Sequence, residues 1–83
     1  MKKYLLKVEV EPLEEGGYLA TCADLQGCHA EGDTIAEALV NVEDVARILL
    51  ELRREDGLDL PEGLEQVEPG AVIKAQVVVT VPE

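Results

Sequence analysis

The sequence predicts an α+β fold of two layers, in which one helix packs on one face of a mostly antiparallel, four-stranded sheet. Three observations lead to this prediction. Short segments with two-residue alternation or turn signals occupy residues 3–31, helical periodicity follows over residues 34–56, and a β-branched run covers residues 71–81. The expected element order is β-β-β-α-β, and residues 1–83 are expected to form a single domain.

The first strand is expected over residues 3–11, where apolar and polar side chains alternate. Four apolar side chains share one face: Tyr4, Leu6, Val8 and Val10. Pro12 ends this strand, and the stretch Glu14-Glu15-Gly16-Gly17 favours a hairpin, because glycine adopts positive φ without strain. A second strand is then expected from Tyr18 to about Ala23.

A second turn is indicated by Asp24-Leu25-Gln26-Gly27, which has Asp at its first position and Gly at its fourth, as type I turns often do. Residues 28–31 are expected to form a short third strand. Gly32-Asp33-Thr34 closes that strand and leads into the helix.

The helix is the best-defined element of the sequence and is expected from Thr34 to Asp56. Thr34 and Glu37 have the spacing of a capping box at its start. Its apolar positions recur at three- and four-residue steps: Ile35, Ala38, Leu39, Val42, Val45, Ala46, Leu49 and Leu50. Gly57 is placed to cap its end, after two arginines in the last turn.

Residues 58–70 contain two prolines and two glycines and are expected to form a return loop. The run over residues 71–81 then predicts a fourth strand, parallel to the first, with one apolar face: Ile73, Ala75, Val77, Val79 and Val81. The expected strand order, 3-2-1-4, leaves two sheet edges and one sheet face uncovered. Such surfaces are candidates for binding or dimerisation.

The charge of the chain bears on its partners. With 18 acidic and 7 basic residues among 83, the formal net charge is −11. This charge repels phosphate backbones and anionic membranes and attracts basic proteins, although it also serves solubility alone. Aromatic residues make up 2%, too few for the stacking sites of single-stranded nucleic-acid binders. No signal peptide or membrane span is recognisable, so a cytoplasmic location is expected.

The candidate chemical groups favour a binding role over catalysis. Cys22, Cys28 and His29 are close in sequence, but a structural zinc site needs four ligands, and a strand sends Cys28 and His29 to opposite faces. Buried, uncharged thiols are the preferred interpretation. A nuclease-type two-metal site would need convergence of carboxylates such as Glu9, Asp24, Glu37 or Glu43. We expect no catalytic residues, no metal site and no cofactor.

Three motifs together resemble the HicB antitoxin family, and the resemblance covers nearly the whole chain. They are Gly16-Gly17-Tyr18, Asp24-Leu25-Gln26-Gly27-Cys28 and Gly32-Asp33-Thr34-Ile35-Ala36-Glu37-Ala38. The resemblance implies a partial ribonuclease H-like fold and neutralisation of a small basic, mRNA-cleaving toxin, HicA, by direct contact. Many members carry prolines beside the second motif, where this chain has Ala23 and Gln26.

Many members also add a C-terminal DNA-binding segment, whereas here only Pro82 and Glu83 follow the expected last strand. We therefore expect no direct nucleic-acid binding by this chain alone. The first hypothesis is an antitoxin-type module that binds a small basic toxin through acidic residues near an open strand edge: Glu9, Glu11, Glu14, Glu15 and Asp24. The motif residues expected to shape the fold are Gly16, Gly17, Tyr18, Gly27, Gly32, Asp33, Thr34 and Glu37.

The second hypothesis is a solitary homo-oligomer of unknown role, a dimer or higher, that has no toxin partner, with or without a small-ligand site. Its symmetric interface would cover apolar positions such as Leu5, Leu19 and Val78. A vestigial nuclease with Glu9 as a metal ligand is a third alternative.

Overall fold

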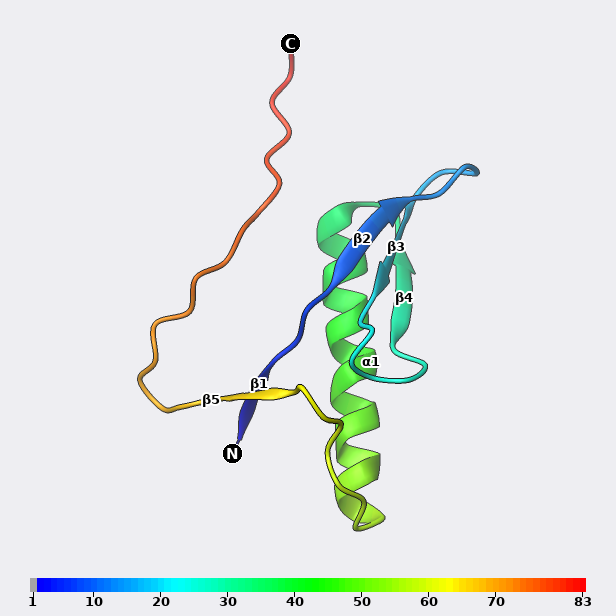
Figure 1. The fold of residues 1–83 in the computed structure, drawn as a ribbon. Helices are drawn as coiled ribbons and strands as arrows, with labels where there is room; N and C mark the ends of the chain where they lie inside the picture. Colours follow the sequence, from blue (N-terminus) through cyan, green and yellow to red (C-terminus); the bar gives the residue numbers. More distant parts are fainter. Residues whose placement is uncertain (1) are drawn as a thin grey trace.

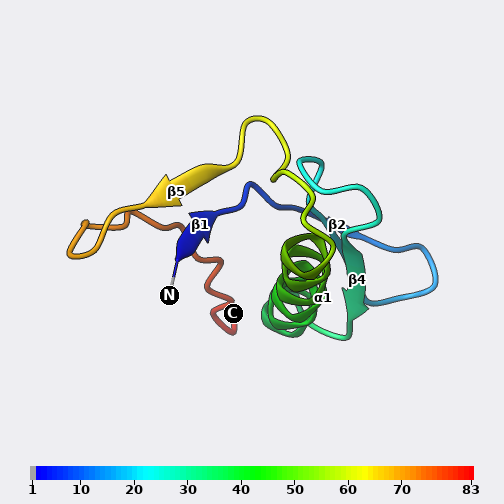
Figure 2. The same ribbon diagram turned by 90° about the horizontal axis from the view of Figure 1, so that it is seen from below.

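The structure, a computed structural model, describes residues 2–83 and confirms the α+β class. The described elements follow in the order β1 (Lys3–Leu5), β2 (Glu9–Pro12), β3 (Tyr18–Thr21), β4 (His29–Gly32), α1 (Ile35–Glu55) and β5 (Glu65–Val67) (Figure 1). They form two antiparallel sheets, a three-stranded sheet in the order β2-β3-β4 and a two-stranded sheet of β1 and β5. The helix α1 lies against one face of the three-stranded sheet, as Figure 2 shows almost along the helix axis.

The glycines of the first hairpin adopt the backbone conformations that the sequence predicts. The Leu13 N–H donates to the carbonyl oxygen of Gly17 at 3.0 Å, which closes the connection between β2 and β3. Gly16 and Gly17 have φ values of 103° and 83°, in the region that side chains with a Cβ avoid.

The connection between β3 and β4 differs in detail from the sequence prediction. It consists of two successive turns, since the Leu25 N–H donates to the Cys22 carbonyl at 3.4 Å and the Cys28 N–H to the Leu25 carbonyl at 3.1 Å. Gly27 is the third residue of the second turn, with a φ of 78°, and not the fourth residue of a turn that begins at Asp24. The predicted type I turn over Asp24–Gly27 is therefore wrong, because the shift by one residue brings Leu25 into the core.

The N-cap at Thr34 and the C-terminal cap at Gly57 that the sequence predicts are both formed. The Thr34 hydroxyl accepts a hydrogen bond from the Glu37 N–H at 3.0 Å. At the other end, Gly57 has a φ of 69°, its N–H donates to the Arg54 carbonyl at 3.2 Å, and the Leu58 N–H donates to the Arg53 carbonyl at 2.9 Å. These two bonds form a Schellman motif, which satisfies carbonyl groups that the helix leaves without partners.

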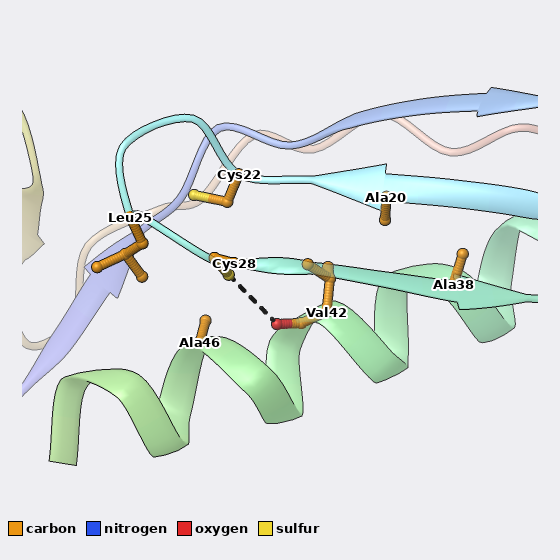
Figure 3. Packing of buried hydrophobic residues seen from close by; sticks show 7 residues of the cluster. All are labelled: Ala20, Cys22, Leu25, Cys28, Ala38, Val42 and Ala46. Carbon is orange, nitrogen blue, oxygen red and sulfur yellow. Dashed lines mark hydrogen bonds between the residues drawn. The ribbon is translucent and has the colours of Figure 1, made fainter. Parts of the chain in front are cut away.

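The core lies between α1 and the three-stranded sheet and consists of small and medium side chains (Figure 3). Its buried residues are Ala20, Cys22, Leu25, Cys28, Ala38, Val42 and Ala46. The small side chains let the end of β4 approach the helix closely: a Cβ built on Gly32 would overlap the backbone of Glu37 and Ala38. Leu39, expected on the packed face of the helix, is instead 40% exposed.

The predicted first strand is divided in two. The alternation over residues 3–11 is present, since side chains at even positions are half-buried and those at odd positions are exposed. However, β3 ends at Thr21, whose partner in β2 is Glu9, so the chain that precedes Glu9 has no β3 residue to pair with. The residues Leu6–Val8 therefore belong to neither sheet, and β1 pairs with β5.

The predicted fourth strand is not formed, which is the main correction to the expected four-stranded sheet of order 3-2-1-4. The strands expected first, second and third lie in the expected order as β2, β3 and β4. Residues 71–81 join neither sheet, because β5, within the expected return loop, pairs with β1, and a turn from Glu68 to Ala71 then directs the chain away (Figure 1).

The described residues 2–83 include no helix long and apolar enough to cross a membrane.

Candidate functional site

The face of the three-stranded sheet that points away from α1 is the candidate functional site, and we call it the outer face. The strand register places two rows of side chains on it. Glu9, Thr21 and His29 are opposite one another in one row, and Glu11, Leu19 and Glu31 form the other. The alternate positions Val10, Ala20 and Ala30 point to the helix and belong to the core or pack against it.

The outer face is accessible and acidic. Glu9, Glu11, Glu31, Thr21 and His29 are exposed, and Leu19 is half-buried. Because neighbouring strands lie about 4.8 Å apart, the backbones of Glu11 and Glu31 are separated by about 10 Å, with Leu19 between them. A single apolar side chain flanked by two carboxylates can receive a basic side chain whose stem packs on Leu19 while its charge meets a carboxylate.

The other acidic residues predicted for partner binding lie at opposite ends of this sheet. Glu14 and Glu15 are exposed in the hairpin between β2 and β3, which extends beyond the sheet (Figure 1). Asp24 is half-buried in the connection between β3 and β4. Its carboxylate lies near Gly63, in the loop that follows α1, because a Cβ built on Gly63 would be 4.0 Å from Asp24 Oδ1. The structure therefore brings Glu9 and Glu11 together and sets Asp24 apart.

Glu31 is the outer-face carboxylate that the sequence-based selection missed. Its position follows from the alternation of β4, in which Cys28 and Ala30 point inward while His29 and Glu31 point outward. The alternation signal was available in the sequence. The opposition of Glu31 to Leu19, and through it to Glu11, requires the strand register.

Of the remaining motif residues, Tyr18 lies on the helix side of the sheet and packs against the core. Asp33 is exposed between β4 and α1, next to the Thr34 cap.

The two cysteines are buried in the core, in agreement with their interpretation as small apolar side chains (Figure 3). The Cys28 thiol donates to the Val42 carbonyl with an Sγ to oxygen distance of 3.9 Å. Burial raises the pKa of the Cys28 thiol, and the neighbouring Cys22 raises it further. A thiol with a raised pKa is a poor nucleophile near neutral pH, because little of it is thiolate.

The carboxylates considered for a metal site do not converge. Glu9 is on the outer face, whereas Glu37 and Glu43 are on α1, which lies against the opposite face of the sheet. Within residues 2–83 the structure brings together no group of three side chains from His, Cys, Asp and Glu that could hold a metal ion.

A second feature is an apolar hollow between the N-terminal segment and α1, beside the edge formed by β2. It is lined by Tyr4, Leu6, Val8, Cys22, Leu39, Val42 and Glu43. The helix packs mainly on β4 and β3 and much less on β2, so within residues 2–83 the three-stranded sheet covers this side of the helix least. Leu39, which is 40% exposed, lies in the lining of this hollow.

Comparison with known proteins shows relatives among the UPF0150 proteins. The chain is 40% identical to UPF0150 protein ssl0738 of Synechocystis sp. (strain ATCC 27184 / PCC 6803 / Kazusa) over 47 residues, which are 57% of this chain and 65% of that protein. It is also 40% identical to UPF0150 protein ssr1765 of the same strain over 48 residues, 58% of this chain and 61% of the relative.

A third relative is an uncharacterised 14.9 kDa protein in the rep-hol intergenic region of Haemophilus phage HP1, 35% identical over 46 residues, 55% of this chain and 35% of the phage protein. The matched region spans less than two thirds of each of these three relatives. No protein-family model matches the chain, and no solved structure matches it.

Proposed function

We propose that this chain is a protein-binding module of the HicB antitoxin type, which neutralises a small basic, mRNA-cleaving, HicA-like toxin by direct contact. The observation that carries the proposal is the outer face, an accessible sheet surface where Glu11 and Glu31 flank Leu19 and Glu9 lies in the neighbouring row. The proposed contact places basic side chains of the toxin between these carboxylates, with Glu14 and Glu15 extending the acidic surface along the hairpin.

Charge supports a basic partner. The formal net charge of −11 creates an attractive field for a positively charged protein, which accelerates the encounter and weakens as salt screens it. The same charge opposes contact with nucleic acid, so neutralisation by direct protein contact is preferred over competition for RNA.

The motif residues support the family resemblance through the roles they have in the fold. Gly16 and Gly17 adopt positive φ in the hairpin next to the acidic strand β2. Gly32 lets the end of β4 lie against the start of α1, and Thr34 caps that helix, on the side of the sheet opposite the outer face.

The proposal is tested by capture from lysate of the native host at low salt, with two variants of equal charge. One carries Glu11→Lys and Glu31→Lys on the outer face, and its control carries Glu51→Lys and Glu55→Lys on the helix, far from that face. We expect the wild-type chain and the control to retain a small basic protein that the outer-face variant loses.

The retained protein, once purified, should cleave mRNA, and added wild-type chain should stop the cleavage in a salt-dependent manner. The proposal is wrong if the retained protein has no RNA-cleaving activity, or if both variants retain it equally.

A second candidate function is that of a solitary homo-oligomer with a small-ligand site. The apolar hollow beside β2 favours it, because small-molecule sites are concave and largely apolar. Native mass spectrometry of the chain purified from its host distinguishes the two functions. A co-purifying small molecule that is lost in a Leu39→Glu variant supports the solitary role, and a co-purifying basic protein supports the antitoxin role.

A further inference from the structure

The C-terminal segment over residues 71–83, which we call the arm, is an apolar chain that the structure leaves in solvent. All of its residues are exposed, and the exposed fractions of Val72, Val77 and Val79 are 87%, 83% and 74%. The radius of gyration is 14.3 Å, whereas a compact chain of this length has about 12 Å. The arm therefore runs outside the packed body (Figures 1 and 2).

The composition of the arm is that of a strand. Val, Ile and Thr dominate it, and Ile73, Ala75, Val77, Val79 and Val81 share one face. Its backbone N–H and C=O groups are in neither sheet. A single extended strand is not stable in water, because strands gain stability by pairing with a sheet edge and by packing one face on a core. The arm thus has the properties of a strand without a partner.

The packed body has a matching acceptor. β2 is an edge strand of the three-stranded sheet, and its outward edge has no neighbour among the described residues 2–83. Beside this edge lies the apolar hollow lined by Leu6, Val8 and Leu39, where a strand added next to β2 would place its inward side chains. A strand paired with this edge and packed over the hollow would complete a four-stranded sheet with the helix on one face.

The path of the chain directs the arm away from its own acceptor. β5 pairs with β1 in the register Lys3 to Val67, which holds the chain before the arm on the flank of the N-terminal strand. The Ala71 N–H then donates to the Glu68 carbonyl at 3.1 Å in a turn whose Gly70 has a φ of 79°. After this turn the arm leaves the body (Figure 1).

We infer that the arm pairs with a second copy of this chain: the arm of each copy adds as a fourth strand to the β2 edge of the other, with its apolar face on the hollow. The occupant of the β2 edge is thus residues 71–81 of a partner copy. An exchange of identical segments needs no new surface and gives a closed dimer. The interface buries valine and isoleucine side chains that are otherwise in water.

Charge is compatible with this pairing. Two copies with a formal charge of −11 each repel one another, but within residues 71–81 the single charged residue is Lys74. The acceptor edge bears Glu9 and Glu11. A nearly neutral arm with one lysine therefore approaches an acidic edge without the repulsion that most of the surface would cause.

The exchange is tested by cross-linking two full-length variants that carry tags of different size. One has Leu39→Cys in the hollow and the other Val77→Cys in the arm, and the native Cys22 and Cys28 are buried and should not react. We expect a short bismaleimide to link the two variants to each other when they are mixed. If the link forms only inside a chain that carries both substitutions, and never between the two variants, the arm folds onto its own body and the inference is overturned.

A second measurement uses the apolar pattern of the arm. By light scattering the wild-type chain should have twice the 9.0 kDa mass of one chain. Val77→Asp with Val79→Asp, on the apolar face, should shift the protein to the monomer mass, and Gln76→Asp with Thr80→Asp, which has the same charge change on the opposite face, should stay dimeric. The helical circular dichroism signal should be unchanged in both. A wild-type chain of monomer mass at all concentrations would exclude the exchange, and this result is independent of the outer-face variants that test toxin binding.

Discussion

Valine residues in two regions of the molecule have opposite surroundings. Val42, in the middle of α1, is 3% exposed, whereas Val77, in the middle of the arm, is 83% exposed. The two residues are chemically identical, and both lie in segments of strong apolar periodicity. Val42 is buried because capped helix ends and two hairpins fix the surfaces around it, whereas Val77 follows a turn that leads out of the body. The apolar periodicity thus determines which face of a segment is apolar, and the turns before and after the segment determine whether that face is buried.

The largest expected effect tests whether the packed body alone determines the stability of the chain. Leu25→Ala removes a side chain that is 2% exposed and should lower the free energy of unfolding by about 2–5 kcal/mol, through lost burial and the cavity that remains. Val78→Ala in the arm, where the side chain is 71% exposed, is the control and should change the free energy by no more than about 0.5 kcal/mol in the monomer. Urea unfolding at low protein concentration measures both. Equal effects would mean that the arm belongs to the folded body.

Substitution of two glycines by alanine should change the free energy of unfolding less than Leu25→Ala does, and it compares the packed body with the turn before the arm. Gly32 has no room for a Cβ, because the backbone of Glu37 and Ala38 lies against it, so Gly32→Ala should destabilise the body by about 1–3 kcal/mol. Gly70 has open space around it, and its φ of 79° affects only the turn before the arm. Gly70→Ala should leave the unfolding midpoint of the monomer nearly unchanged, and a large shift would show that the arm is part of the cooperative unit.

The smallest expected effect is the contribution of the Cys28 thiol to the pH dependence of the free energy of unfolding. Burial raises its pKa above its ordinary value of 9.0, so the folded state binds the proton more tightly than the unfolded state does. The resulting stabilisation is complete below pH 9.0 and is lost as the pH rises through the folded-state pKa. Cys28→Ala should therefore lose less stability than the wild type between pH 8 and pH 10, as measured by urea midpoints. An identical pH dependence would indicate that the thiol is accessible to water.

The helix could be predicted from the sequence because its signals are local. The spacing of Thr34 and Glu37 and the position of Gly57 each specify a cap through contacts within a few residues, and the structure shows both caps. The three antiparallel strands were also predictable in number and order. Their lengths were not, because the end of β3 at Thr21 depends on the two turns that follow it, and this end determines where pairing with β2 begins.

Whether residues 71–81 pair with a sheet could not be predicted from their own alternation of apolar and polar side chains. A two-residue alternation predicts a strand with one apolar face, but it contains no information about which edge that strand will meet. The strand β5, which pairs with β1, lies in a segment rich in prolines and glycines. Such a composition predicts a loop and gives no sign of the pairing. The outer face was partly predictable for the same reason: alternation identified Glu9 and Glu11, and only the register adds Glu31 opposite Leu19.

The two edges of the three-stranded sheet differ in one more respect. The Asn41 side chain donates to the Glu31 carbonyl at 2.8 Å, so the helix itself occupies a hydrogen-bonding position on β4. An exposed sheet edge is a template for pairing with another chain, and covering the edge with a helix is one way in which proteins limit such pairing. A side-chain amide on the helix thus covers one hydrogen-bonding position of the β4 edge, whereas the outward edge of β2 has no neighbour among the described residues 2–83.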